Sequence, residues 1–209
     1  MYLPFWTFDA EASADWQAEA GFHYYVSETY TDSQGVKRER QVQHTRWEPA
    51  AGHVDHTFDD VLVSASVGVP TDLIEEVCPF PTEALIAYDP SYIKGWTVEH
   101  YQIDLIAGAE NSRARMDSSL RALCAEQVPG DTHRALTVAS EFDNLTFKHI
   151  LVPVWLVTYT YGAKTFQVLV NGATGKVAGH YPKSWIKIAL AVITALIVIG
   201  IIAFMSSQR

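Results

Sequence analysis

The residue types best suited to chemistry lie in one short stretch, 53–60, which holds two histidines and three aspartates. His53 and His56 are of a type that binds metal ions, and Asp59 with Asp60 could complete such a site. The histidines are three positions apart, so an extended strand would turn them to opposite faces. Exposed loop histidines are the competing interpretation, and the sequence leaves open whether these four residues bind a metal.

Asp59 and Asp60 could also act together as a general acid and base, which would require the two carboxylates to share a site. Adjacent side chains on an extended chain point apart, so we expect capping or turn formation at these positions instead. The following run, Val61–Val63, reads as a buried strand. An enzyme that uses Asp59, Asp60 and His56 is kept as an alternative function.

Residues 172–177, Gly-Ala-Thr-Gly-Lys-Val, partly match a phosphate-binding loop. The stretch is too short, lacks a Ser or Thr after the lysine and does not lead into a helix. We therefore expect a strand–turn–strand in which Asn171, Gly172 and Gly175 are turn or interaction residues. The chain has no Gly-x-Ser-x-Gly or His-Glu-x-x-His motif and no Gly-x-Gly-x-x-Gly unit. The sequence thus predicts a protein that is not an enzyme, with no catalytic residue, no cofactor and no metal ligand.

The elements that would carry these residues are mostly strands. Alternating apolar and polar residues predict strands at 2–7, 15–27, 36–47, 57–67, 96–103, 136–147, 149–161, 165–170 and 176–180. Turns are expected at 32–35, 143–144 and 162–163. Apolar residues at helical spacing predict one long amphipathic helix that begins at Leu105 after an Asp104 N-cap and ends before Gly130. The pattern indicates an α+β fold with antiparallel sheets.

The expected organisation is one α+β domain over residues 1–184, followed by an anchor and a short tail over 185–209. Within the domain, Leu3-Pro4-Phe5-Trp6 and Val152-Pro153-Val154-Trp155 share an apolar-Pro-x-Trp pattern. This echo suggests the hypothesis that the domain contains two related β units.

The anchor is predicted from a run of 18 uncharged residues, Ile188 to Met205. At about 1.5 Å per residue this run spans about 27 Å as a helix, close to the roughly 30 Å of a bilayer core. Trp185 and Lys187 stand at its start, where aromatic and basic residues favour the headgroup layer. A buried core helix would carry a more polar face than this run does.

Charge suggests an orientation for the anchor. Lys176, Lys183 and Lys187 precede the apolar run and only Arg209 follows it, so the positive-inside rule places the domain in the cytoplasm and the C-terminus outside. Residues 1–104 hold 18 acidic and five basic residues, whereas residues 105–209 are net basic. A formal charge of −9 disfavours non-specific nucleic-acid binding. The acidic half would then face the cytosol or a basic partner, and an ordinary solvated surface is the competing interpretation.

The chain also resembles a known family. Three signatures carry the resemblance: the opening Tyr2–Ala10; Arg46-Trp47 with Gly52 and Phe58–Val63; and Thr146–Trp155 with Tyr159, Tyr161, Lys164, Val170–Gly172, Thr174-Gly175, Pro182 and Lys187. Together they resemble bacterial membrane proteins with a TFIIB-type zinc ribbon, which are often labelled primosomal-protein-N′-like or DNA helicase. The resemblance spans nearly all of residues 2–190.

What the resemblance implies is a membrane adaptor. Family members usually carry an N-terminal zinc ribbon with CxxC pairs, and this sequence begins at the signature that follows it, so zinc binding is not carried over. No motor motif supports the helicase label. Some relatives are encoded beside phage-shock and SPFH-type membrane scaffolds, which suggests that this protein recruits such a scaffold. A nucleic-acid accessory role, as the family label suggests, is the alternative.

Overall fold

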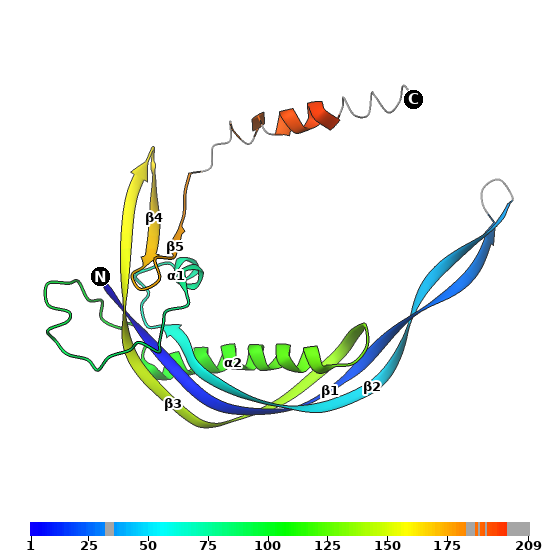
Figure 1. The fold of residues 1–209 in the computed structure, drawn as a ribbon, viewed down its shortest axis with the longest axis horizontal. Coiled ribbons are helices and arrows are strands. Elements are labelled where there is room, and N and C mark those ends of the chain that lie inside the picture. The colour runs from blue at the N-terminus through cyan, green and yellow to red at the C-terminus, as the bar shows by residue number, and fades with distance from the viewer. Residues whose placement is uncertain (32–35, 183–186, 188, 191, 200–209) are drawn as a thin grey trace. The chain divides into compact units, whose positions relative to one another are not determined.

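The computed structural model describes residues 1–31, 36–182, 187, 189–190 and 192–199. This part of the chain has the predicted α+β fold, with an antiparallel five-stranded sheet in the order β2-β1-β3-β4-β5 (Figure 1). The strands are β1 (Tyr2–Thr31), β2 (Lys37–Ser64), β3 (Thr132–Tyr161), β4 (Lys164–Asn171) and β5 (Val177–Gly179), and the helices are α1 (Thr71–Val77) and α2 (Leu105–Gln127). Two compact units are formed, residues 1–71 with 81–153, and residues 72–80 with 154–209.

In the first unit, β1 alternates between small apolar and polar side chains. Its even-numbered positions form a buried row that we call the alanine row: Ala10, Ala12, Ala14, Ala18 and Ala20. The odd-numbered positions include Asp9, Glu11, Asp15 and Glu19. Since successive side chains of a strand point to opposite faces, β1 turns alanines to one side and carboxylates to the other.

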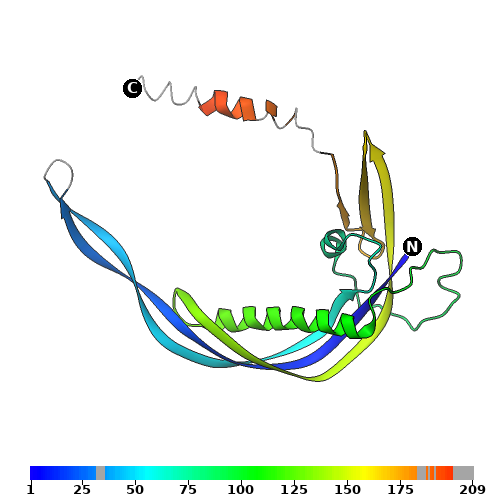
Figure 2. The same ribbon diagram turned by 180° about the vertical axis from the view of Figure 1, so that it is seen from behind.

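Helix α2 lies along the alanine side of the sheet (Figures 1 and 2). As predicted, Asp104 is its N-cap, and the carboxylate accepts a hydrogen bond of 2.9 Å from the Ala107 amide. The helix buries a stripe at four-residue spacing: Gly108, Ser112, Met116, Leu120 and Cys124. At Gly108, a Cβ would come within 2.7 Å of the Trp6 ring, so glycine allows the close approach of helix and sheet.

Three β-bulges bend the strands of this unit. Asp60, Ala135 and Asn144 are the non-glycine residues with positive φ among those described, and each lies where the strand register shifts. A bulge increases the local bend and twist of its strand. The strands accordingly curve around the helix side of the sheet, as the two views show (Figures 1 and 2).

Beyond Gly21, β1 and β2 continue as a two-stranded ribbon. Pairing between β1 and β3 ends at Gly21 opposite Thr132, while β1 and β2 pair as far as Thr31 opposite Lys37. Cross-strand contacts support the ribbon, including the Arg40–Glu28 ion pair at 3.1 Å. The predicted turn at 32–35 lies outside the described residues.

Two predictions from local sequence are wrong. The expected turn at Asp143-Asn144 is a β-bulge inside the continuous strand β3, because Asn144 takes up the left-handed conformation without reversing the chain. The expected strand at 96–103 is a loop with a single bridge between Val98 and Tyr2. In contrast, the predicted turn at 162–163 joins β3 to β4.

The two apolar-Pro-x-Trp segments lie close together. In the first unit, Tyr2 is opposite Pro153 and Leu3 is opposite Val152 on the antiparallel strands β1 and β3. This adjacency does not test whether two related β units exist, and that hypothesis stays a prediction.

The described part of the chain contains no helix that is both long and apolar enough to cross a membrane. Residues 187, 189–190 and 192–199 are helical. Of the predicted anchor residues, Lys187 is described, whereas Trp185, Ile188 and Met205 lie outside the described residues.

The close approach at Gly108 leads to a first prediction. Gly108→Val should lower the free energy of unfolding by about 1–3 kcal/mol, because the new side chain must displace the Trp6 ring. Ala114→Val, at an exposed position of the same helix, is the control and should cost less. Urea unfolding measures both, and equal stabilities of the two variants would contradict the packing described.

Candidate functional site

The face of β1, β2 and β3 that points away from α2 is strongly acidic. Directly paired residues share a face, so the carboxylates of β2 and β3 that lie opposite odd-numbered residues of β1 join those of β1. We call the resulting set the acidic face: Asp9, Glu11, Asp15, Glu19, Asp55, Glu141 and Asp143. Basic side chains among the described residues also reach it, including Lys148 beside Asp9 and Arg134, which bonds to Glu19.

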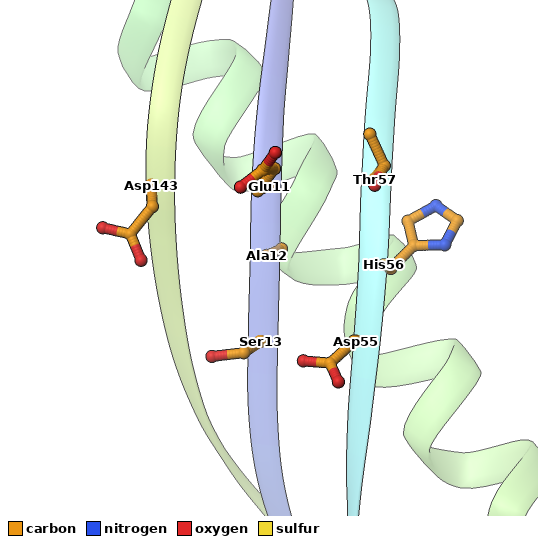
Figure 3. A pocket seen from close by; sticks show the side chains of 7 residues that line it. All are labelled: Glu11, Ala12, Ser13, Asp55, His56, Thr57 and Asp143. Atoms are coloured by element: carbon orange, nitrogen blue, oxygen red, sulfur yellow. The ribbon is translucent and has the colours of Figure 1, made fainter.

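A shallow depression of about 400 Å³ lies at the centre of the acidic face. It is lined by Glu11, Ala12, Ser13, Asp55, His56, Thr57 and Asp143. Figure 3 shows one carboxylate from each of three strands, Glu11, Asp55 and Asp143, with α2 behind the sheet. Glu11 accepts a hydrogen bond of 2.7 Å from the side-chain amide of Asn144 on the neighbouring strand β3. The concentration of negative charge suits a cationic group, such as the ammonium or guanidinium of a partner protein.

The bulge in β2 gathers a second set of carboxylates. One carboxylate oxygen each from Asp9, Asp59 and Asp60 lies within 4.8 Å of the others. The expectation that adjacent Asp59 and Asp60 point apart is therefore wrong, because Asp60, with φ of 50°, breaks the alternation of an extended strand. These three residues are the described group that could hold a metal ion.

Lys148 already supplies positive charge to this group. Its Nζ lies 2.9 Å from Asp60 Oδ1 and 3.6 Å from Asp9 Oδ2. The Asp60 amide donates to Asp9 Oδ1 at 2.8 Å, and the Thr146 hydroxyl donates to Asp9 Oδ2 at 3.0 Å. Burial favours a higher pKa for Asp60, but the hydrogen bonds from Lys148 and Thr82 outweigh it and hold the pKa below its ordinary value. Asp9, Asp60 and Lys148 thus form an ion-pair network, and Asp59 lies beside it.

The two histidines do not share a site. His53 lies on the acidic face, where its ring nitrogens are 2.8 Å from Asp15 and 3.0 Å from Asp55. The hydrogen bond to Asp15, followed by that to Asp55, raises the pKa of His53. His56 is paired with Ala12 of the alanine row, and its ring contacts the Phe58 ring at 4.5 Å. Neither histidine belongs to the carboxylate group of Asp59 and Asp60.

The remaining candidate residues form a turn in the second unit. Asn171 is completely buried at the end of β4, and its side-chain nitrogen donates to the carbonyls of Val77 and Pro79, both at 3.1 Å. Its side-chain oxygen accepts from the amides of Ala173 and Thr174. Every polar atom of this side chain has a partner, so Asn171 ties the turn to the segment after α1.

Gly172 begins that turn, and Gly175 closes it with φ of 75°. This left-handed conformation favours glycine, which explains the residue type at position 175 without a ligand.

Sequence reasoning missed Glu11, Asp55, Asp143 and Lys148. The signal for the first of these was present as the strict alternation of residues 9–15, Asp-Ala-Glu-Ala-Ser-Ala-Asp. The net charge of residues 1–104 shows that this half of the chain is acidic, but it does not show that the carboxylates gather on one face of the sheet. The position of Lys148 depends on strand register and on the bulges, which no local pattern reveals.

Comparisons with known proteins provide one distant relative. No family model matches the chain, and no solved structure matches it. The chain is 24% identical over 193 residues to the uncharacterized protein YdjG of Bacillus subtilis, a match that covers 90% of this chain and 53% of YdjG. The chain therefore spans about half the length of this curated relative, whose name carries no activity.

Removing the cation of the network should change the titration of Asp60. In Lys148→Met, the pKa of Asp60 should rise, because the hydrogen bond and charge that lower it are lost. The free energy of unfolding at pH 7 should fall by about 1 kcal/mol or less, as for other partly exposed ion pairs. Carboxyl NMR titration and urea unfolding measure the two effects.

The pH dependence has a definite sign. Because the pKa of Asp60 is lower in the folded protein, its contribution to stability is present above the ordinary aspartate pKa and is lost as the pH falls through the folded value. The difference between wild type and Lys148→Met should therefore shrink in acid. Lys164→Met, at an exposed position, is the control, and an unchanged Asp60 pKa in Lys148→Met would refute the network.

Proposed function

We propose that this protein is a non-catalytic adaptor that residues 185–206 anchor in a membrane, with residues 1–184 in the cytoplasm available to bind another protein. The observation that carries the proposal is the chemistry of the terminal segment. Its described large aliphatic residues are all about half exposed or more: Leu190, Val192, Ile193, Leu196, Ile197, Val198 and Ile199.

These residues surround the helix instead of forming a stripe. Positions 196 to 199 are consecutive and cover a full helical turn, so no orientation of this helix on a protein surface would bury them all. The polar Thr194 donates its hydroxyl to the Leu190 carbonyl at 2.8 Å and so satisfies its own hydrogen bond within the helix. A helix that is apolar all round suits the interior of a bilayer.

The acidic face supports the interaction role. It is an open sheet face on which Glu11, Asp55 and Asp143 surround a depression, and negative charge of this density favours a basic partner surface. The same face would repel phosphates, which disfavours the alternative of a nucleic-acid accessory protein. We propose a membrane scaffold as the partner, in line with the family that the sequence resembles.

We propose a non-catalytic protein because two of the candidate carboxylates, Asp9 and Asp60, have a partner. The closeness of Asp9, Asp59 and Asp60 is the observation that supports the alternative of an enzyme. However, Lys148 already pairs with Asp60 and Asp9 of that group, and His56 does not belong to it. A structural ion-pair network accounts for these contacts without a reaction.

Membrane extraction tests the anchor. The full chain should remain in the membrane pellet after washing with alkaline carbonate and should be released by detergent. Leu196→Lys should shift protein to the wash, because a charge in the apolar run costs about 2.5–3.5 kcal/mol near the bilayer centre. Leu196→Phe is the matched apolar control and should stay in the pellet. Recovery of the unaggregated wild-type chain in the wash would refute the anchor.

Purification from detergent-solubilised native membranes tests the partner. The wild type should retain a stoichiometric protein that the variant Glu11→Gln/Asp143→Asn loses, because the depression would keep only one of its three carboxylates, Asp55. Glu110→Gln/Glu126→Gln removes two exposed charges from α2 instead and should retain it. Equal recovery from both double variants would show that the acidic face is not the docking surface.

A further inference from the structure

The loop at residues 84–103 of the first unit exposes apolar side chains. Its last part, residues 97–103, which we call the base, is hydrogen-bonded to the start of β1 and the residue that follows β2. The Tyr2 amide donates to the Thr97 carbonyl at 2.8 Å, the Glu99 amide donates to the Tyr2 carbonyl at 3.0 Å, and the Ile103 amide donates to the Ala65 carbonyl at 3.1 Å. The loop leaves the sheet beside the N-terminus in Figure 1.

The outer part of the loop, residues 84–96, is shaped by its own turns. The Tyr92 amide donates to the Asp89 carbonyl at 3.1 Å, and the Ser91 amide donates to the Asp89 carboxylate at 2.7 Å. The Trp96 amide donates to the Ile93 carbonyl at 3.0 Å, and its ring meets the Tyr2 ring edge-on at the base. The loop thus has a defined shape that does not depend on a helix or strand.

Apolar side chains of this outer part face solvent instead of folding inward. Ile86 is 71% exposed, Tyr88 67% and Tyr92 55%, and Leu85 is also exposed. Asp89 and Lys94 are the charged residues between positions 84 and 96, so the segment is neutral in a chain whose formal charge is −9. Apolar surface of this kind marks a binding region.

We propose that residues 85–92 insert into the interfacial layer of a lipid bilayer. Adjacent Leu85 and Ile86 provide the apolar tip, and Tyr88, Tyr92 and Trp96 follow as rings with one apolar and one polar end, the residue types that favour the headgroup layer. Lys94 can reach lipid phosphate. The segment from 84 to 88 offers a protein partner only the Tyr88 hydroxyl for a directional side-chain hydrogen bond, which favours lipid over a specific protein surface.

This inference rests on the proposed anchoring, which supplies the bilayer. Insertion of a neutral loop depends on apolar contact and not on charge. It should therefore occur in zwitterionic lipid and persist in high salt, which separates it from attraction to anionic headgroups.

The test compares two exposed isoleucines of the same unit. Ile86→Cys and Ile106→Cys, 71% and 73% exposed, are each made in the full chain with Cys78→Ser and Cys124→Ala. Both are labelled with an environment-sensitive fluorophore and reconstituted in phosphatidylcholine vesicles with or without lipids that carry a nitroxide quencher. The label at position 86 should shift to the blue and lose emission to the quencher, while the label at position 106 should change in neither respect.

Two outcomes would overturn the inference. If the protein remains with the vesicles but the label at position 86 is not quenched, the loop does not enter the bilayer, although the anchor does. A blue shift already present in detergent and insensitive to the lipid quencher would show that a protein surface covers the loop. If the labelled chain does not remain with washed vesicles, the anchor fails, and vesicles added to the free protein then test the loop by the same quenching.

Discussion

The contact between α2 and the alanine row of β1 is the constraint on which the first unit depends. A helix approaches a sheet closely where both surfaces carry small side chains. Here the sheet contributes the alanine row, and the buried stripe of α2 contains Gly108 and Ser112. The alanines Ala10 to Ala14 share one buried cluster with Met116 of the helix. Gly108 extends the same principle to the Trp6 ring. The central strand must alternate strictly to form this row, and its other side is then free to carry charge.

The acidic face is a consequence of that alternation, and the bulges modify it locally. At Asp60 the bulge brings neighbouring carboxylates together, and Lys148 offsets the repulsion between them. At Asn144 the bulge places an amide donor on Glu11. Toward the centre, His53 bridges Asp15 and Asp55, so part of the charge there depends on the protonation of one imidazole.

The fold class and the long helix could be predicted from the sequence because they follow from local periodicity and from the cap at Asp104. The continuity of β1 was missed because its alanine-rich and acidic composition is not that of a typical strand, although its period is two. The bulge at Asn144 was mistaken for a turn, since the same residue type adopts left-handed conformations in both settings. The network around Lys148 joins residues 88 positions apart, which only strand register brings together.

The ribbon beyond Gly21 differs from the rest of the sheet, because β1 there pairs with β2 alone and none of its described residues belongs to the buried cluster of α2 and the alanine row. An isolated pair of strands is only marginally stable in water. Its separation therefore need not disturb the packing of α2 on the alanine row. The backbone amides of residues 22–31 will accordingly exchange their hydrogens with solvent through local opening, whereas those of residues 8–16 will wait for unfolding of the whole unit.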